Sequence, residues 1–478
     1  MQARISSDLE APHLTPSDLF TKKALDVDLA LLCFCPSSPS LEKYKVENIE
    51  ERLFLHIHPS HTFYALLNGV RFIVICEVYG GPVAVSVMEE LAFYGVKSVI
   101  GLGFVGSLLS TLKQGDMVIV ERALTEPGTT PFYSLEEYLS PDQFLLDYFL
   151  QTSPSPGRVT SWTTNAIYRE YTEDIQEALS QGCQVVNMDT SHLYASCKKL
   201  GIKCVYLAAI SDGLEKDTQD LSSLSQGADL LTNLCSLVYD NLDYLRLFLG
   251  CAQMMDEISI CPSHNLEHLF KVFQHCKQAL LLEELEDGKK RLCNYASILH
   301  DIDDGKFFST RDYANARRLL SRLPEEQIEE VVRMISLVSS SVNGDSMPED
   351  CIEKPYMLYP RHADRLEAIG AVGVYRCYRY CKTTNMPMFT PDTPKAKDEE
   401  DLWQNVATEG RYKAYKGKSS FGTKQSAFAS MIDHYYDKLL RLGLFETNNT
   451  YLQRIKKDRI DIMVRVVMNF ARKGYVEE

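Results

Sequence analysis

The chain has 478 residues, of which 45% are hydrophobic and 24% charged, a composition typical of a globular protein with about two or three domains. Its formal net charge of −15 argues against nucleic-acid binding as the main function, because phosphate backbones select for Lys and Arg. No stretch approaches the roughly 18 unbroken apolar residues that a membrane span requires. We therefore expect neither a nucleic acid nor a membrane as partner.

Cysteine usage and the N-terminus predict the compartment. Fourteen cysteines are scattered without a C-x-x-C pair, and several, such as Cys33 and Cys76, lie in apolar runs where free cysteine behaves as a small hydrophobe. The first twenty residues, "MQARISSDLEAPHLTPSDLF", are polar and do not resemble a secretory signal. We expect a reduced, cytoplasmic protein in which residues 1–26 form an N-terminal tail.

The first half of the chain alternates between strand and helix patterns. Short β-branched runs occupy 28–34, 71–78, 97–103, 116–124, 184–188 and 203–210. Helical patterns separate several of them, for instance at 81–95 and 190–201. Strands that are apolar on both faces and interleaved with helices are typical of a layered α/β fold. Residues 27–250 are therefore predicted to form a mostly parallel sheet flanked by helices.

The second half carries helical periodicity instead. It is clearest at 264–286, 313–323, 325–340, 362–381 and 426–442, with no convincing strand between these segments. Residues 251–478 are therefore predicted to form an all-α domain. One part of it, 384–420, is rich in Pro, Lys, Asp and Gly, which favours a long loop or lid.

A pair of ionisable residues ends one of the apolar helical runs. His300 and Asp301 follow Ile298 and Leu299, and such groups are costly to bury unless something, for instance a metal ion, compensates them. His268 lies on an earlier helix and Asp364 at the head of a later one. Mixed nitrogen and oxygen ligation of this kind suits Mn, Fe, Co, Ni or Zn and leaves positions for water and substrate. Spacing alone leaves a capped or solvated helix end as the alternative.

Three blocks, "SHNLEHLFKVF", "LHDIDDGKFF" and "HADRLEAIGAVGVYR", resemble the HD-domain metal-dependent phosphohydrolase superfamily, and a bacterial branch of it most closely. The resemblance implies a hydrolase of a nucleotide or related small phosphate ester. It also implies a divalent metal held by His268, His300, Asp301 and Asp364. Asp304 and Lys306 match polar residues that follow the family's HD pair. With Asp301 they are the catalytic candidates, and Lys306 is expected to contact the substrate phosphate.

Blocks of the first half, including "YGGPVAVSVMEEL", "GVKSVIGLGFVGSL" and "VVNMDTSHLYASCKKLGIKCVYLAAISDG", resemble the nucleoside phosphorylase superfamily, which includes purine and uridine phosphorylases. The resemblance implies that Met188 and Asp189 bind the ribose and that Tyr168 lies at the base. It also implies that Asp212 protonates or orients the base. A turn-forming aspartate before Gly213 is the alternative for Asp212.

The phosphate side departs from the family's pattern. The family's arginine and threonine correspond to Gly101 and Phe104, which cannot hold a phosphate as an arginine fork does. We therefore expect a phosphohydrolase fused to a nucleoside-binding domain that lacks phosphorolysis. Two alternatives stay open: a nucleosidase that depends on Asp212, and a catalytically inactive regulatory or scaffold protein. The expected partner is a small nucleoside or nucleotide, and a homo-oligomer formed through the first domain is left open.

Overall fold

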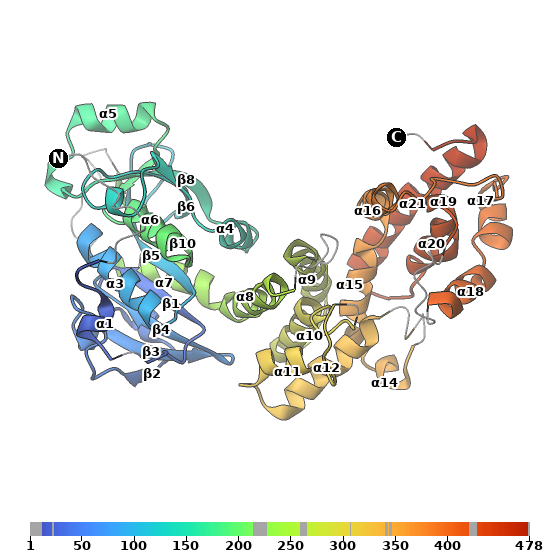
Figure 1. Cartoon of the computed structure of the whole chain (residues 1–478), viewed down its shortest axis with the longest axis horizontal. Helices are drawn as coiled ribbons and strands as arrows, with labels where there is room; N and C mark the ends of the chain where they lie inside the picture. Colours follow the sequence, from blue (N-terminus) through green and yellow to red (C-terminus); the bar gives the residue numbers. More distant parts are fainter. Residues whose placement is uncertain are drawn as a thin grey trace. The chain divides into compact units, whose positions relative to one another are not determined.

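The computed structural model describes residues 12–21, 23–213, 227–258, 265–305, 307–339, 343, 347–419 and 428–476. The chain divides into two compact units, Met1–Arg246 and Leu247–Glu478, which Figure 1 shows with strands in the first and helices in the second. The prediction of an α/β first half and a helical second half is therefore confirmed. None of the described helices combines the length and apolarity needed to cross a membrane.

A single ten-stranded sheet forms the centre of the first unit. Its strands are β1 (Leu29–Phe34), β2 (Lys45–Asn48), β3 (Thr62–Leu67), β4 (Val70–Ile75), β5 (Ser98–Ser107), β6 (Met117–Leu124), β7 (Tyr138–Leu139), β8 (Gly157–Thr163), β9 (Val185–Asn187) and β10 (Lys203–Gly213). Strand β5 pairs with β10 and β9, and the pairings β9–β8, β8–β6 and β6–β10 close a ring of five strands. The remaining order β5-β1-β4-β3-β2 extends this ring on one side.

The sheet is mixed, so the prediction of a mostly parallel sheet is confirmed only in part. Five of the ten pairings are parallel, among them β4–β1, β1–β5 and the longest pairing, β5–β10, and five are antiparallel. One reason is local. Asn68 and Gly69 both have positive φ, 49° and 79°, so β3 and β4 are joined by a tight Asn-Gly hairpin and must run antiparallel.

Helices cover this sheet. They are α1 (Pro16–Leu19), α2 (Pro39–Glu42), α3 (Gly81–Phe93), α4 (Gln143–Leu150), α5 (Thr172–Ser180), α6 (Thr190–Leu200) and α7 (Gly227–Tyr239), with short 3-10 turns η1 (Pro59–His61), η2 (Thr130–Phe132) and η3 (Ile167–Arg169). Helix α8 (Leu242–Asp256) follows them, and most of its residues belong to the second unit. Helices α3 and α6 are the two that the sequence predicted, and they pack against each other. Every residue of β1 is buried, as expected for a strand with apolar side chains on both faces.

The second unit contains no strand among its described residues. Its helices are α9 (Leu266–Leu281), α10 (Asp287–Leu299), α11 (Ala314–Leu320), α12 (Glu325–Val338), α14 (Glu349–Ile352), η7 (Pro355–Leu358), α15 (Tyr359–Glu367), α16 (Gly370–Thr383), α17 (Glu399–Asp401), η8 (Leu402–Val406), α18 (Glu409–Ser419), α19 (Met431–His434), η9 (Tyr435–Leu439), α20 (Leu440–Leu442) and α21 (Thr450–Lys473). Helices α9, α10 and α15 pack against one another.

Two predictions about this unit are corrected. The predicted loop at 384–420 contains α17, η8 and α18, because Asp398 caps the N-terminus of α17 and Leu402 provides a buried apolar contact. The single helical pattern at 362–381 is two helices. Gly370 has a φ of +76°, a conformation that L side chains rarely adopt, and it separates α15 from α16.

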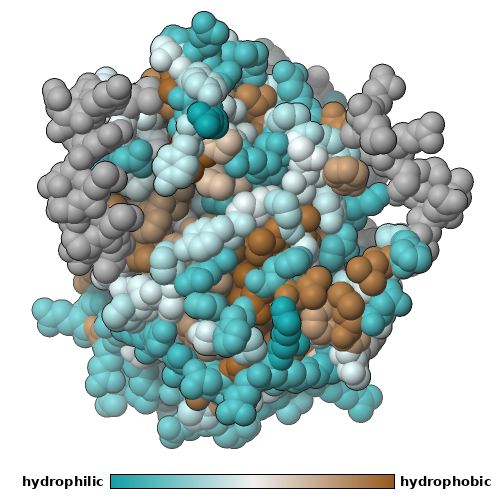
Figure 2. Space-filling view, turned by 90° about the vertical axis from the view of Figure 1, so that its left-hand side faces the viewer, coloured by the Kyte–Doolittle hydropathy of each residue, from teal (hydrophilic) through white to brown (hydrophobic). Residues whose placement is uncertain are grey.

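The surface is mixed in character. Figure 2 shows hydrophobic groups exposed within a mainly hydrophilic face. Among the described residues, the most exposed large apolar side chains include Tyr168, Leu135 and Phe132. Single exposed apolar side chains are ordinary on protein surfaces.

Candidate functional site

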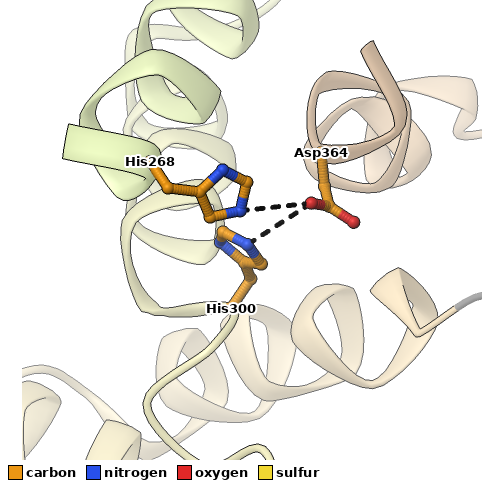
Figure 3. A group of neighbouring side chains, drawn as sticks. All are labelled: His268, His300 and Asp364. Carbon is orange, nitrogen blue, oxygen red and sulfur yellow. Dashed lines mark ion pairs between the residues drawn. The ribbon is translucent and has the colours of Figure 1, made fainter. Parts of the chain in front are cut away.

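The four predicted metal ligands come from three packed helices and the turn after one of them. His268 lies in the first turn of α9, which is capped by the side chain of Asn265. His300 is the C-terminal capping residue of α10, and Asp301 follows it. Asp364 projects from α15 towards both histidines (Figure 3). The packing of α9, α10 and α15 thus brings side chains that are distant in sequence to one place.

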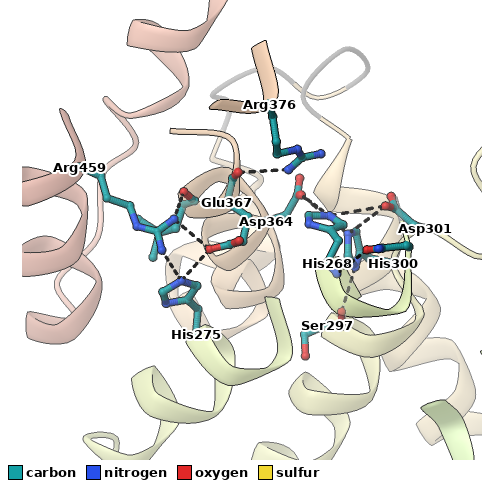
Figure 4. A network of polar contacts seen from close by, with 11 residues as sticks. His268, His275, Ser297, His300, Asp301, Asp364, Glu367, Arg376 and Arg459 are labelled. Atoms are coloured by element: carbon teal, nitrogen blue, oxygen red, sulfur yellow. Dashed lines mark hydrogen bonds and ion pairs between the residues drawn. The ribbon is translucent and has the colours of Figure 1, made fainter. Parts of the chain in front are cut away.

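The donor atoms of His268, His300 and Asp364 are spaced closely enough to share one cation, and Asp301 lies outside this group of three. Oδ1 of Asp364 lies 3.4 Å from Nε2 of His268 and 3.7 Å from Nε2 of His300. Oδ2 of Asp301 lies 3.6 Å and 3.4 Å from the same two nitrogens. Donor atoms about 2.0–2.2 Å from a shared ion are roughly 3.0–3.5 Å apart when they are neighbours around it. His268, His300 and Asp364 each offer an atom within 4.8 Å of the others, and Asp301 lies on the far side of the imidazoles from Asp364 (Figure 4).

The orientation of the His300 ring is fixed by a hydrogen bond at Nδ1, the ring nitrogen that points away from the carboxylates. Its Nδ1 donates a hydrogen bond of 2.9 Å to the carbonyl oxygen of Ser297, which leaves Nε2 facing Asp301 and Asp364. This Nε2 is buried and has no hydrogen-bond partner within the described ranges. Burial alone would lower the pKa of His300, but the carboxylates of Asp301 and Asp364 raise it above its ordinary value. An unpartnered buried nitrogen facing two carboxylates is the environment that a cation would satisfy.

The two histidines of the candidate metal site are buried, whereas the carboxylate of Asp364 is partly exposed to solvent. The side chain of His300 is 1% exposed and that of His268 6%, whereas that of Asp364 is 32% exposed. Burial would raise the pKa of Asp364, but the hydrogen bond to His268 and the proximity of His300 lower it below its ordinary value. Solvent or a small substrate can therefore reach the group on the Asp364 side.

The two further catalytic candidates lie in the turn after His300. Asp304 is half-buried, and its charge contributes to the raised pKa of His300. Lys306 lies outside the described residues. Asp303, which the sequence did not single out, fixes this turn: it accepts hydrogen bonds from Thr310 Oγ1 at 2.6 Å and from the backbone nitrogens of Asn315 and Ala316 at 3.0 and 2.9 Å.

A second group of predicted residues lies at the strand ends of the first unit. Asp189 follows β9 and is buried, and Tyr206 donates a long hydrogen bond of 3.4 Å from its hydroxyl to Oδ2 of Asp189. Burial raises the pKa of Asp189 to about 7, although hydrogen bonds from the Gly80 backbone and from Tyr206 oppose the shift. Met188 is half-buried beside it.

The predicted base-binding residues are more exposed. Asp212 is the second-to-last residue of β10, opposite Gly106 of β5, and it is exposed to solvent. The pKa of Glu170 is raised by burial and by the nearby charge of Asp212, so a second carboxyl group lies close to it. Tyr168 is 93% exposed, and the structure does not bring its ring against Asp189 or Asp212.

The glycine-rich strand β5 has no room for a phosphate-binding side chain. A Cβ added to Gly101 would lie 2.8 Å from side-chain carbons of both Leu193 and Tyr206, and the Tyr206 hydroxyl lies directly over Gly103. Tyr206 in turn packs on Phe34, with ring centroids 5.4 Å apart. Aromatic and aliphatic side chains therefore occupy the space next to the glycines.

Residues 28–239 match the family model of the phosphorylase superfamily. An uncharacterized protein of Acanthamoeba polyphaga mimivirus, R802, is 44% identical over 216 residues, which are 44% of this chain and 85% of the viral protein. Residues 28–239 form a domain of the phosphorylase superfamily. A second mimivirus protein, L803, is 38% identical over 225 residues, covering 43% of this chain and 88% of its own length. The DeoD-type purine nucleoside phosphorylase of Caldanaerobacter subterraneus subsp. tengcongensis is 26% identical over 200 residues, covering 40% of this chain and 86% of the bacterial protein.

The phosphorylase-superfamily match includes the strand ends that carry Met188, Asp189 and Asp212, so the predicted resemblance of the first half is confirmed. The cluster of His268, His300 and Asp364 lies beyond the matched residues. The resemblance of the second half to HD-domain phosphohydrolases stays a prediction.

Sequence reasoning missed most of the residues that support the two groups. Tyr206 lies in a predicted strand, but nothing in the pattern shows that its hydroxyl reaches Asp189. His275 is recognisable from the sequence as sharing a helix face with His268, which it follows by seven residues, whereas Glu367, three residues after Asp364, was missed although its spacing is also helical.

Proposed function

We propose that the second unit is a metal-dependent phosphohydrolase of the HD type that acts on a nucleotide or a related small phosphate ester. The observation that carries this proposal is the convergence of His268, His300 and Asp364, whose donor atoms all lie within 4.8 Å of one another, with Asp301 close to both histidines. A set of two imidazoles and two carboxylates beside solvent is better suited to metal chemistry than to packing.

The residues present fit a divalent cation. His268, His300, Asp301 and Asp364 would hold it, and their nitrogen and oxygen donors are compatible with Mn, Fe, Co, Ni or Zn. When bound, such an ion supplies a water of lowered pKa and neutralises charge on a phosphoryl oxygen. The pKa of His300 is raised and that of Asp364 is lowered for the same reason: the carboxylates and the imidazoles attract each other when charged.

The neighbouring residues would orient the site and the substrate. The Ser297 carbonyl holds His300 in the tautomer whose Nε2 faces the two carboxylates. Asp304, adjacent to His300, would hold or accept a proton at its carboxylate. Lys306 would contact the substrate phosphate as a compact positive charge. Entry from the Asp364 side is consistent with the exposure of that side chain.

For the phosphorylase-superfamily unit the proposal is nucleoside binding without phosphorolysis. Met188 and Asp189 would bind the ribose and Asp212 the base, at the strand ends where open α/β sheets place their ligands. The side chains packed on Gly101 and the hydroxyl over Gly103 support the loss of phosphorolysis, because they leave no room for an arginine side chain at either position. A nucleosidase remains the second candidate, favoured by the exposed Asp212 with Glu170 near it.

A hydrolysis screen separates these functions. Purified full-length protein is incubated with a panel of nucleotides and nucleosides, with and without added Mn²⁺, and released phosphate and free base are measured. The proposal predicts metal-dependent release of phosphate that Asp301→Ala abolishes and Asp212→Asn leaves intact. Free base that persists in Asp301→Ala and vanishes in Asp212→Asn would favour the nucleosidase. Protein that binds no divalent metal and cleaves nothing would refute the hydrolase and favour a regulatory protein.

A further inference from the structure

A buried ionic cluster of Glu367, His275 and Arg459, named here the Glu367 cluster, lies next to the candidate metal site (Figure 4). Nη1 of Arg459 donates to Oε1 of Glu367 at 2.9 Å. Nε2 of His275 lies 3.0 Å from the same oxygen and 2.9 Å from Nη2 of Arg459, so it donates to Glu367 when protonated and accepts from Arg459 when unprotonated. The three side chains come from α15, α9 and α21, so the cluster joins three helices at one point.

The ion pair of Glu367 and Arg459 is buried together with His275 and has little access to water. The Glu367 side chain is 2% exposed, that of His275 13% and that of Arg459 19%. Burial alone would raise the pKa of Glu367, but the hydrogen bond with His275 and the charge of Arg459 lower it to about 2. A buried carboxylate that stays ionised holds its partners in a fixed geometry, because leaving it unpaired is strongly unfavourable.

Two of the three residues share a helix face with a candidate ligand. Glu367 follows Asp364 by three residues on α15, and His275 follows His268 by seven on α9. The bond between Glu367 and His275 therefore links the same two helices that present Asp364 and His268, about one to two turns away from those ligands. Because α9 and α15 are rigid helices, their relative position at the Glu367 cluster would set the distance between His268 and Asp364.

Arg459 of α21 contacts the Glu367 cluster by passing close to Gly370. A Cβ added to Gly370 would lie 2.8 Å from Cγ of Arg459 and 2.9 Å from its Cβ, so the absence of a side chain at this position lets Arg459 pass. Arg459 also donates to the carbonyl oxygen of Leu366, and Arg376 of α16 donates to that of Glu367 at 3.1 Å. Both guanidinium groups therefore bind the C-terminal end of α15, where cations are favoured by the exposed carbonyl groups.

We propose that Glu367 is a positioning residue for the metal site: by pairing with His275 and Arg459 it holds α15 against α9 and sets the distance between Asp364 and His268. This proposal rests on the proposed metal-binding function. It assigns to the C-terminal helix α21, through Arg459, a part in metal binding although no candidate ligand lies on that helix. Groups hydrogen-bonded directly to a metal ligand change metal affinity by about 10–100-fold when they are removed, and the lower end of that range is the expected effect for a residue that acts through the helix packing.

The test compares two buried ionic clusters of the same unit. Asp433 is the matched control, because it is 6% exposed and pairs with Arg411 at 2.9 Å while accepting hydrogen bonds from Thr393 and Ser430. Dissociation constants for Mn²⁺ are measured by calorimetry on full-length wild type, Glu367→Gln and Asp433→Asn, and thermal unfolding is recorded for each. The proposal predicts that Glu367→Gln weakens Mn²⁺ binding by about 10-fold or more and that Asp433→Asn changes it by less than about 2-fold.

A milder variant covers the case in which Glu367→Gln does not fold. The hydroxyl oxygen of Tyr451 lies 2.8 Å from Nδ1 of His275. Tyr451→Phe therefore removes this hydrogen bond to His275 and keeps the ion pair of Glu367 and Arg459. It should weaken Mn²⁺ binding in the same direction by a smaller factor. Unchanged affinity in both Glu367 cluster variants, or an equal loss in Asp433→Asn, would overturn the positioning role while leaving the metal site intact. Wild-type protein that binds no Mn²⁺ would instead remove the proposed function, and this inference with it.

Discussion

His300 donates its Nδ1 proton to the carbonyl oxygen of Ser297 across 2.9 Å, which leaves its buried Nε2 facing Asp301 and Asp364. A backbone carbonyl cannot accept from an unprotonated nitrogen, so Nδ1 carries a proton. This contact fixes the ring so that Nε2 faces the two carboxylates.

Replacing His300 by alanine should lower the affinity for Mn²⁺ by about 100-fold or more, because a ligand and its preset orientation are both lost. Calorimetric titration of the full-length protein measures the change. His56, an exposed histidine of the first unit, provides the matched control, and His56→Ala should bind as the wild type does. Equal binding by His300→Ala and wild type would place the metal elsewhere.

Asp303→Ala should destabilise the second unit by about 1–2 kcal/mol, because the carboxylate accepts backbone hydrogen bonds from Asn315 and Ala316 at the start of α11. Urea unfolding measures this cost. The same change should slow any phosphate release, since the turn that carries Asp304 is held by Asp303. Asp312→Asn is a suitable comparison, because Asp312 is exposed, has a φ of 54°, and asparagine tolerates that conformation. A fully stable Asp303→Ala protein would show that the turn has another support.

The stability of the first unit should fall as the pH rises towards 8. The folded-state pKa of Asp189 is raised to about 7, above its ordinary value, so its contribution is fully present below about pH 4 and is lost as the pH passes 7. The effect is on the order of a few kcal/mol. Asp189→Asn should flatten this part of the pH profile and raise the unfolding temperature at pH 8. A wild-type profile that is flat between pH 5 and 8 would mean that Asp189 titrates normally.

Gly101→Ala should cost about 1–3 kcal/mol of stability, because the added methyl group would lie 2.8 Å from carbons of Leu193 and Tyr206 in a closely packed strand. Gly157→Ala is the matched control in the same sheet, since a Cβ there meets atoms only at 3.8 Å. Thermal unfolding of both variants checks the difference. Two variants of equal stability would show that the side chains over β5 can move aside, and that the phosphate space is not closed.

The sequence predicted the strands that are buried on both faces, and it missed those built from polar residues. Strand β8 illustrates the reason: Thr160, Ser161 and Thr163 are all buried, and the backbone nitrogen of Thr160 donates a hydrogen bond to the side-chain oxygen of Gln184. Polar side chains satisfied by tertiary partners leave no hydrophobic pattern. The Asn68-Gly69 hairpin, in contrast, was readable as a turn and would have predicted that β3 and β4 are antiparallel.

The candidate ligands were predictable through resemblance and residue type, whereas their support was not. His268, His300, Asp301 and Asp364 lie in separate segments, and no spacing rule places α9, α10 and α15 against one another. Arg459 is further away still in the sequence, and its approach to Glu367 depends on Gly370 and on the packing of α21, both of which are tertiary features.

The central claim is that side chains of three packed helices share one divalent cation. Its most direct test is the anomalous diffraction of a crystal of the full-length protein grown with Mn²⁺. The account predicts a peak about 2.0–2.3 Å from Nε2 of His268, Nε2 of His300 and a carboxylate oxygen of Asp364. A fully soaked crystal that binds manganese only at other residues, or not at all, would contradict it.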